Sequence, residues 1–208
     1  MHTLTLAASK GGVGKTTLSS AIAVEAARKH QVGLYDLDPQ QSLARWHELR
    51  ANGDNISIIE ARSAEDALSA ATEQGCDLLI IDTPPALMLA IQPAIEIADL
   101  VVIPCKPSPI DVESIDPTVE LAQTAGRPFV FVVNMVPTQG GAGLTKGTRE
   151  FLKFNGDVMP QAVSQRLPYT AAMASGKSGP EVERDKKCAG EIQTLWRAIS
   201  RKLHGLGK

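Results

Sequence analysis

A glycine-rich loop near the N-terminus carries residue types that bind phosphate. It reads Ser9-Lys10-Gly11-Gly12-Val13-Gly14-Lys15-Thr16-Thr17 and follows a short apolar run. Glycines let the backbone curl so that successive N–H groups point at phosphate oxygens, and a helix opening at Thr16 adds its positive dipole end. We expect Lys15 to neutralise the β- and γ-phosphates and the Thr16 hydroxyl to bind Mg²⁺. Ser9 stands where the general pattern G-x-x-x-x-G-K-[ST] begins with glycine, but the strand–loop–helix context disfavours a chance turn.

Lys10 is a second departure from the general pattern. A lysine just before the glycines cannot easily reach the phosphates that Lys15 neutralises, but it is placed to reach a phosphate in a facing subunit. The alternative interpretation is an ordinary exposed loop residue.

Two further segments place acidic residues after apolar runs. Asp36 and Asp38 lie in Tyr35-Asp36-Leu37-Asp38-Pro39-Gln40, and Asp82 ends the run 78–82. A carboxylate at the C-terminal end of a parallel strand faces the ligand crevice of such a sheet. Asp82 is predicted to hold the Mg²⁺ shell through water, because Mg²⁺ takes few protein ligands. Taken singly, each acid is also compatible with a helix cap.

The elements that must position these residues alternate between strand and helix. Apolar, β-rich runs predict strands at 4–8, 31–37, 56–60, 77–82, 99–105 and 128–135. Helical spacing predicts helices at 16–29, 41–51, 64–74 and 112–124. Repeated βα units with right-handed crossovers predict an α/β fold with a doubly wound, mostly parallel sheet flanked by helices.

The C-terminal part follows a different pattern. A flexible loop at 137–143 precedes a predicted helix at 144–154, a short strand near 158–163, a turn at Leu167-Pro168, and a mostly helical segment from 181 to 203 that Gly190 interrupts. Repeats, low-complexity tracts and linkers are absent from the sequence, so we expect a single domain over 1–208.

Charge is unevenly distributed along the chain. Residues 1–145 carry 9 Lys/Arg and 17 Asp/Glu, whereas residues 146–208 carry 12 and 6. A basic, mostly helical C-terminal third indicates either a polyanion-binding face or merely solvated helices.

Composition excludes several classes of protein. At 43% apolar and 21% charged, the chain of 208 residues is globular, and it lacks an apolar run of membrane-spanning length or a secretion signal. Its 3 cysteines form no CxxC pair and its 4 histidines have no ligand spacing, so neither a disulfide framework nor a structural metal is predicted. We therefore expect a cytoplasmic protein.

From Lys10 to Thr17 the loop resembles the deviant Walker A box of the ParA/MinD family of P-loop ATPases, and the resemblance extends from Leu4 to about residue 183. It implies ATP and Mg²⁺ as cofactors, and an ATP-sandwich homodimer in which Lys10 contacts the partner's ATP. The Asp38 segment resembles the family's switch I box, and the Asp82 segment its Walker B pattern. The resemblance implies that Asp38 orients the attacking water, that Thr16, Asp38 and Asp82 serve the metal, and that Asn134 contacts adenine.

The chain looks most like the short ParA class, of which ParF is typical. That similarity implies nucleoid association through non-specific DNA, and hydrolysis stimulated by a ParB-like or other cargo adaptor. The cargo is a plasmid, a chromosome or a protein cluster, as in plasmid partition and DNA segregation. Candidate DNA contacts are the basic residues Arg149, Lys153, Arg166, Lys186 and Lys187.

The main alternative is a MinD-like ATPase that binds membrane through its C-terminal helix. Its apolar residues fall near one helical face, at Ile192, Leu195, Trp196, Ile199, Leu203 and Leu206. Such a stripe indicates either an interfacial amphipathic helix or, more commonly, a terminal helix packed on its own core. A small-molecule synthase or kinase on the same loop and a non-catalytic regulator also remain open.

Overall fold

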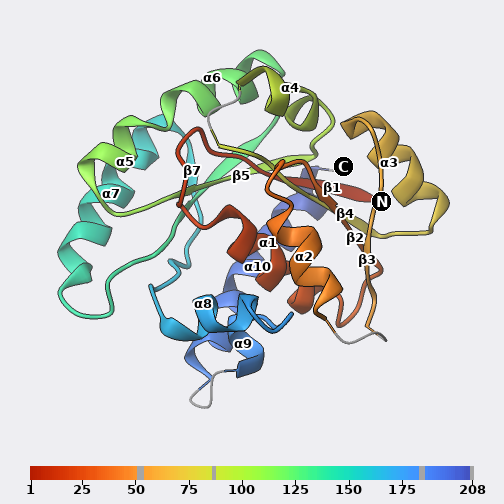
Figure 1. Cartoon of the computed structure of the whole chain (residues 1–208). Helices are drawn as coiled ribbons and strands as arrows, with labels where there is room; N and C mark the ends of the chain where they lie inside the picture. The colour runs from red at the N-terminus through yellow and green to blue at the C-terminus, as the bar shows by residue number, and fades with distance from the viewer. Residues whose placement is uncertain (51–53, 86–87, 183–185, 207–208) are drawn as a thin grey trace.

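A parallel sheet forms the centre of the computed structural model, which describes residues 1–50, 54–85, 88–182 and 186–206 (Figure 1). In these residues seven strands pair in the order β3-β2-β4-β1-β5-β6-β7, each parallel to its neighbours. The strands are β1 (His2–Leu6), β2 (Val32–Asp36), β3 (Ile56–Ile58), β4 (Leu78–Asp82), β5 (Leu100–Cys105), β6 (Phe129–Val133) and β7 (Asp157–Val158). This confirms the predicted α/β fold.

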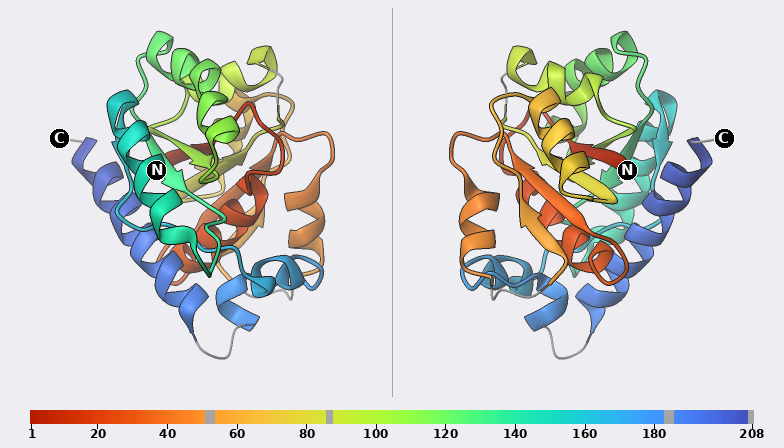
Figure 2. Two further views of the ribbon diagram at one scale, coloured as in Figure 1. Left: turned by 90° about the vertical axis from the view of Figure 1, so that its left-hand side faces the viewer. Right: turned by 90° about the vertical axis from the view of Figure 1, so that its right-hand side faces the viewer.

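Helices cover both faces of the sheet (Figure 2). Those that pack on one face are α1 (Lys15–Ala26), α2 (Ser42–Glu48), α8 (Leu167–Met173) and α10 (Lys187–Leu206). Those on the other face are α3 (Ala64–Glu73), α4 (Met88–Glu96), α5 (Pro109–Glu113), α6 (Asp116–Thr124) and α7 (Gly141–Asn155). The short α9 (Gly179–Val182) follows α8.

Strand β1 shows why the strands are apolar along most of their length. Leu4 and Leu6 are buried on the α1 face, whereas the hydroxyl of Thr5 donates to the carbonyl of Ala94 in α4 at 2.7 Å. Successive side chains of a strand point to opposite faces, so a sheet covered on both sides needs buried residues at every position.

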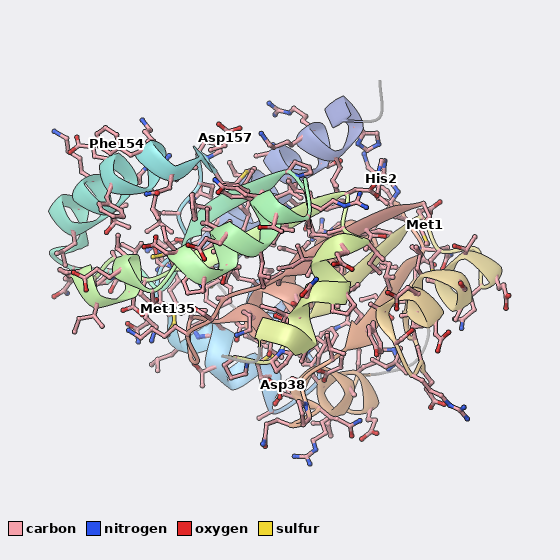
Figure 3. The ribbon with its side chains drawn as sticks, turned by 90° about the horizontal axis from the view of Figure 1, so that it is seen from above. Met1, His2, Asp38, Met135, Phe154 and Asp157 are labelled. Atoms are coloured by element: carbon pink, nitrogen blue, oxygen red, sulfur yellow. The ribbon has the colours of Figure 1, made fainter. Side chains whose placement is uncertain are left out.

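The carboxyl ends of the strands gather on one side of the molecule. Viewed from above, Asp38 and Met135, which follow β2 and β6, lie on one side, while Met1, His2 and Asp157, at strand starts, lie on the other (Figure 3). The phosphate loop connects β1 to α1 on the first side, as a doubly wound sheet requires of a ligand site.

The structure corrects several predicted elements of the middle of the chain. Helix α4 was not predicted, and it carries Pro93 within it. The helix expected at 112–124 is two helices, because Pro117 lies in the first turn of α6 and starts a new helix there. Ala51, the predicted end of the second helix, lies outside the described residues.

Three C-terminal predictions also differ from the structure. The strand expected near 158–163 is shorter in the structure, where β7 consists of Asp157–Val158 alone. The turn expected at Leu167-Pro168 opens α8, because proline's fixed φ suits a first helical turn. Gly190 lies inside α10 without interrupting it, and Glu181 belongs to α9 instead.

The apolar stripe of α10 faces the core. Ile192, Leu195, Ile199 and Leu203 are buried against α1 and the sheet, and Trp196 is partly buried. The side chain of Leu206 lies outside the described residues. Among the described helices, none combines the length and apolar character that crossing a membrane requires.

Candidate functional site

Lys15, Thr16 and Asp82 meet where β1 and β4 end. The Thr16 hydroxyl donates to Oδ2 of Asp82 at 2.6 Å, and Ser19 donates to Oδ1 at 3.3 Å. The Lys15 ammonium lies under the loop and donates to the carbonyl of Ala8 at 3.4 Å. These contacts join the loop to the neighbouring strand and bring together three residues that the sequence motifs singled out.

Burial dominates the electrostatics of this cluster. Asp82 is 1% exposed, and burial raises the pKa of its carboxyl to about 7, against the lowering effects of the Thr16 hydroxyl and the Lys15 charge. Lys15 is 6% exposed, and burial lowers its pKa, while Asp82 and Asp38 oppose that shift. Because Asp82 and Lys15 are poorly solvated, a cation beside Asp82 or a phosphate beside Lys15 would stabilise their charged forms.

A cavity of about 240 Å³ opens beside the loop. Its wall includes Gly12, Gly14 and Asn134, the last of which donates to the carbonyl of Val13 at 2.7 Å. Gly14 has φ 89°, and a Cβ there would lie 2.5 Å from Nδ2 of Asn134. Met135 also lines the cavity, with a φ of 56° that is rare outside glycine. Asn134 thus lies in the wall of the cavity and is tied to the phosphate loop.

Asp36 and Asp38 have different surroundings although they are two residues apart. Asp36 accepts the backbone N–H groups of Leu43 at 2.8 Å and Ala44 at 3.0 Å, so it caps the start of α2. Burial raises its pKa against these bonds. Asp38 is half-buried, accepts the N–H of Gln40 at 2.9 Å, and is close enough to Lys15 to favour its charge. The cap explains Asp36, which leaves Asp38 as the acid available for chemistry.

Lys10 is paired within its own chain. Its ammonium lies 2.9 Å from Oδ1 of Asp111, with side chains 35% and 9% exposed. Burial opposes ionisation of Asp111, but the Ser108 hydroxyl and Lys10 outweigh it and lower the pKa. Sequence reasoning missed Asp111, although Ser108-Pro109-Ile110-Asp111 has the [ST]-x-x-[DE] spacing of a capping box.

Two more residues near the loop were missed. Ser19 bonds Asp82 from the second turn of α1. Lys106 places its ammonium 3.9 Å from where a Cβ of Gly12 would lie. Serine one turn beyond the phosphate loop and lysine at the end of a strand are common enough to carry no signal by themselves.

The five predicted DNA-contacting residues come from separate parts of the basic third. Arg149 and Lys153 lie one turn apart on α7, and Arg149 donates to the carbonyl of Pro160 at 3.3 Å. Arg166 precedes α8, lines the cavity, and pairs with Glu191 at 3.2 Å. The exposed Lys186 and Lys187 stand at the start of α10. Of the five, only Arg166 lines the cavity beside the loop.

Comparison with known proteins decides the class of this site. The family model for the CobQ/CobB/MinD/ParA nucleotide binding domain matches residues 4–179. The chain belongs to this family. That membership confirms the prediction of a nucleotide-binding ATPase of the ParA/MinD type.

Individual relatives match over nearly the whole chain. Maintenance of carboxysome distribution protein A from Halothiobacillus neapolitanus is 28% identical over 204 residues, which cover 93% of this chain and 94% of the relative. An ATP complex of Cyanothece McdA superposes with a TM-score of 0.75 at 20% identity, covering 98% of this chain and 96% of that one. MinD in the MinC:MinD cell division complex of Aquifex aeolicus superposes with a TM-score of 0.80 at 18% identity, covering 97% and 96%. The two superpositions show the shared fold of this ParA/MinD family member.

Proposed function

We propose that this family member is a ParA-type ATPase that dimerises around ATP, binds non-specific DNA and positions a cargo through partner-stimulated hydrolysis. The observation that carries the proposal is the pair of lysines on one loop. Lys15 lies buried beneath the loop, and Lys10 stands partly exposed at its rim. One cation serves the chain's own phosphates, and the second is free to serve those of another copy once it leaves Asp111.

Lys15 and the glycines bind the phosphates of ATP in this proposal. The backbone of Gly11, Gly12, Val13 and Gly14 curls around the phosphates, and Thr16 and Thr17 open α1 beneath them. Asn134 orients the adenine from the cavity wall. A carboxylate and a hydroxyl in contact, Asp82 and Thr16, form a donor set that fits Mg²⁺. Bound there, Mg²⁺ would neutralise phosphate charge.

Asp38 orients the attacking water in this proposal. Its carboxylate keeps an oxygen beyond its bond to Gln40 and lies near the loop that holds the phosphates. A carboxylate at this place stabilises the transition state more than it stabilises bound ATP. It therefore raises the rate of hydrolysis and not the affinity for ATP.

The cargo follows from the pattern of similarity. The match to a carboxysome distribution protein extends over 93% of this chain, which favours a large protein assembly over a plasmid or chromosome. The DNA partner rests on the basic C-terminal third, and the membrane alternative loses support because Ile192, Leu195, Ile199 and Leu203 of α10 are buried. A ParB-like or other adaptor supplies the stimulation of hydrolysis.

Lys15→Ala tests the nucleotide site on which the proposal rests. The variant should lose ATP binding in calorimetry, because the phosphates lose their main counter-charge. It should also lose ATP-dependent co-sedimentation with DNA. Lys177→Ala, an exposed lysine before α9, serves as the control and should bind ATP like wild type. Unchanged ATP affinity in Lys15→Ala would refute the assignment of the loop.

The surface that the ATP-bound protein binds is tested with the wild type alone. Co-sedimentation with DNA and flotation with vesicles are run in ATP and in ADP. ATP-dependent binding to DNA supports the proposal, and ATP-dependent flotation without DNA binding supports the MinD-like alternative.

A further inference from the structure

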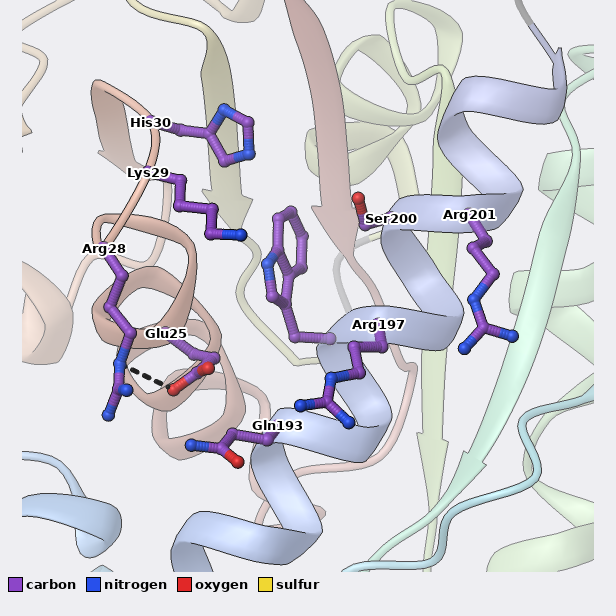
Figure 4. A pocket seen from close by; sticks show the side chains of 9 residues that line it. Glu25, Arg28, Lys29, His30, Gln193, Arg197, Ser200 and Arg201 are labelled. Carbon is purple, nitrogen blue, oxygen red and sulfur yellow. Dashed lines mark ion pairs between the residues drawn. The ribbon is translucent and has the colours of Figure 1, made fainter.

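A cleft of about 420 Å³ lies between the end of α1 and the middle of α10, apart from the nucleotide site (Figure 4). Arg28, Lys29 and His30 contribute to it from the segment after α1. Trp196, Arg197 and Arg201 contribute from α10.

Positive charge dominates the lining of this cleft. Arg28, Lys29, Arg197 and Arg201 are all exposed. Glu25 is the one carboxylate of the lining and pairs with Arg28 at 3.0 Å. The positive charge of Arg197 also favours the ionised form of Glu25. The cleft therefore keeps an excess of three positive charges.

Capping of α1 does not account for this arrangement. Cations after the last turn of a helix complement its dipole, and that explains Arg28 and Lys29. Arg197 and Arg201 lie within α10, one turn apart, and both line the cleft, with Arg197 drawn on the side of α10 that faces α1 (Figure 4). Like charges at this spacing repel each other, so this pair does not stabilise α10 and capping does not explain it.

We propose that this cationic cleft, formed by Arg28, Lys29, Arg197 and Arg201, binds the phosphate backbone of double-stranded DNA. The inference rests on the proposed function, since it names the surface on which DNA lies. Exposed, mobile cations suit a polymer of phosphates, where affinity comes from the release of counterions. A site for a small anion would instead require buried donors fixed around it.

The surroundings of the cleft favour DNA over a lipid surface. An interfacial helix inserts large apolar side chains. Of the large apolar side chains that are exposed in the described residues, none lines the cleft: Met1 lies in the adjoining pocket, which shares His30, Trp196 and Ser200 with it, and the others are Leu49, Ile110, Leu144, Phe151, Phe154 and Leu167. Trp196 is partly buried, with its ring edge-on to His30 at a centroid distance of 6.3 Å, and so it forms part of the cleft wall.

Helix α1 separates the cleft from the phosphate loop. The helix is 12 residues long. At 1.5 Å per residue it spans about 18 Å, which places the loop at its start and the cleft beyond its end. Changes to the cleft should therefore leave the affinity for ATP unaltered.

The test compares the variant Arg197→Ala/Arg201→Ala with Lys202→Ala. Lys202 follows on the same helix but pairs with Asp157 at β7. Binding to a fluorescein-labelled duplex of arbitrary sequence is measured by anisotropy in ATP over a series of KCl concentrations. The double variant should bind about 10-fold or more weakly, with the slope of log K against log[KCl] reduced by about two. Lys202→Ala should match wild type, and calorimetry should show equal ATP affinity in all three proteins.

The outcomes separate this inference from the proposed function. A wild type that binds no duplex in ATP overturns the DNA step of the proposed function and the inference with it. A wild type that binds, with a double variant of equal affinity and slope, overturns the cleft alone. In that event Arg149→Ala/Lys153→Ala on α7 should carry the loss. The last measurement is flotation with vesicles of equal parts phosphatidylglycerol and phosphatidylcholine. If wild type floats, and the double variant loses flotation but still binds the duplex, the cleft is not a DNA site.

Discussion

At the scale of single residues, Gly14 meets two requirements that no other residue type satisfies. Its φ of 89° is strained for any residue with a Cβ, and that Cβ would lie 2.5 Å from Nδ2 of Asn134. Gly14→Ala should therefore lower the free energy of unfolding by about 1–3 kcal/mol. It should also weaken ATP binding, because Asn134 must leave the carbonyl of Val13. Urea denaturation and calorimetry measure the two effects.

Gly143→Ala is the matched control for this change. Gly143 lies in α7, and a Cβ there meets nothing within 4 Å. Alanine inside a helix should raise the free energy of unfolding by about 0.5–1 kcal/mol. Equal effects of the two substitutions would contradict the special role of Gly14.

Asp38 is the residue whose loss should separate binding from chemistry. In the proposed function its carboxylate acts on water in the transition state and little on bound ATP, so Asp38→Ala should slow turnover by about 10²-fold or more. ATP affinity should stay within about threefold, because a transition-state interaction does not contribute to ground-state binding. Phosphate release and calorimetry report the two quantities. Glu120→Ala, an exposed carboxylate on α6, should turn over like wild type, and fast turnover in Asp38→Ala would rule out the role.

At the scale of elements, one ion pair joins α9 to the end of α2. The two terminal guanidinium nitrogens of Arg50, Nη1 and Nη2, each donate to Glu181 at 3.0 Å, and Glu181 also accepts the N–H of Ser178 at 2.7 Å. Burial opposes ionisation of Glu181, but these donors outweigh it and lower its pKa below the ordinary 4.5. A lowered pKa means that the pair stabilises the fold above pH 4.5, and that this contribution is lost as the pH falls through the folded-state value.

Glu181→Gln should therefore lower the free energy of unfolding at pH 7 by about 0.5–1 kcal/mol, because the carboxylate is partly exposed and solvent screens the pair. The difference from wild type should shrink as the pH falls below 4.5, because wild-type Glu181 then becomes neutral as well. Urea denaturation at pH 7 and at successive acidic pH values measures it. Glu73→Gln on the exposed surface of α3 should show no such dependence, and a difference for Glu181→Gln that persists at acidic pH would exclude the ion pair as its cause.

The elements also show how far sequence patterns reach. Buried strands such as β4 were predictable because apolar residues at every position are rarely compatible with another environment. Helix α4 was not, because Pro93 is a poor helix former and only packing of Ile91 and Ile95 on the sheet stabilises the helix around it. In the site, Thr16 and Asp82 were both predicted as magnesium residues from local motifs, and the structure brings them into contact. The pairing of Lys10 with Asp111 depends on a long-range juxtaposition that no local pattern encodes.

At the scale of the whole molecule, the pair between Lys10 and Asp111 sets a condition on assembly. In the proposed dimer each Lys10 must leave Asp111 for a phosphate of the facing copy. Asp111 is almost buried, so its charge then loses a close partner at a cost. The γ-phosphate of ATP provides a stronger attraction than ADP, which lacks it, and so ATP should favour the dimer.

Lys10→Ala should remove this exchange while leaving Lys15 to bind nucleotide. We expect a protein that binds a non-hydrolysable ATP analogue as a monomer and neither hydrolyses ATP nor loads onto DNA. Because Asp111 would be left as a buried unpaired charge, Lys10→Ala/Asp111→Asn is measured beside it to keep the fold intact. Asp111→Asn alone should dimerise at lower protein concentration than wild type, since Lys10 no longer has to give up a charged partner.

Mixing experiments and sedimentation test whether Lys10 acts on the facing copy. Lys10→Ala and Lys15→Ala protomers together should not restore two working sites, because each site needs Lys15 from its own chain and Lys10 from the other. Two such sites facing each other across a two-fold axis make ATP part of the interface, so that affinity for nucleotide and affinity between copies rise together. Sedimentation velocity with the ATP analogue measures the second affinity directly. A Lys10→Ala protein that dimerises like wild type would show that the lysine at the rim of the loop serves its own chain only.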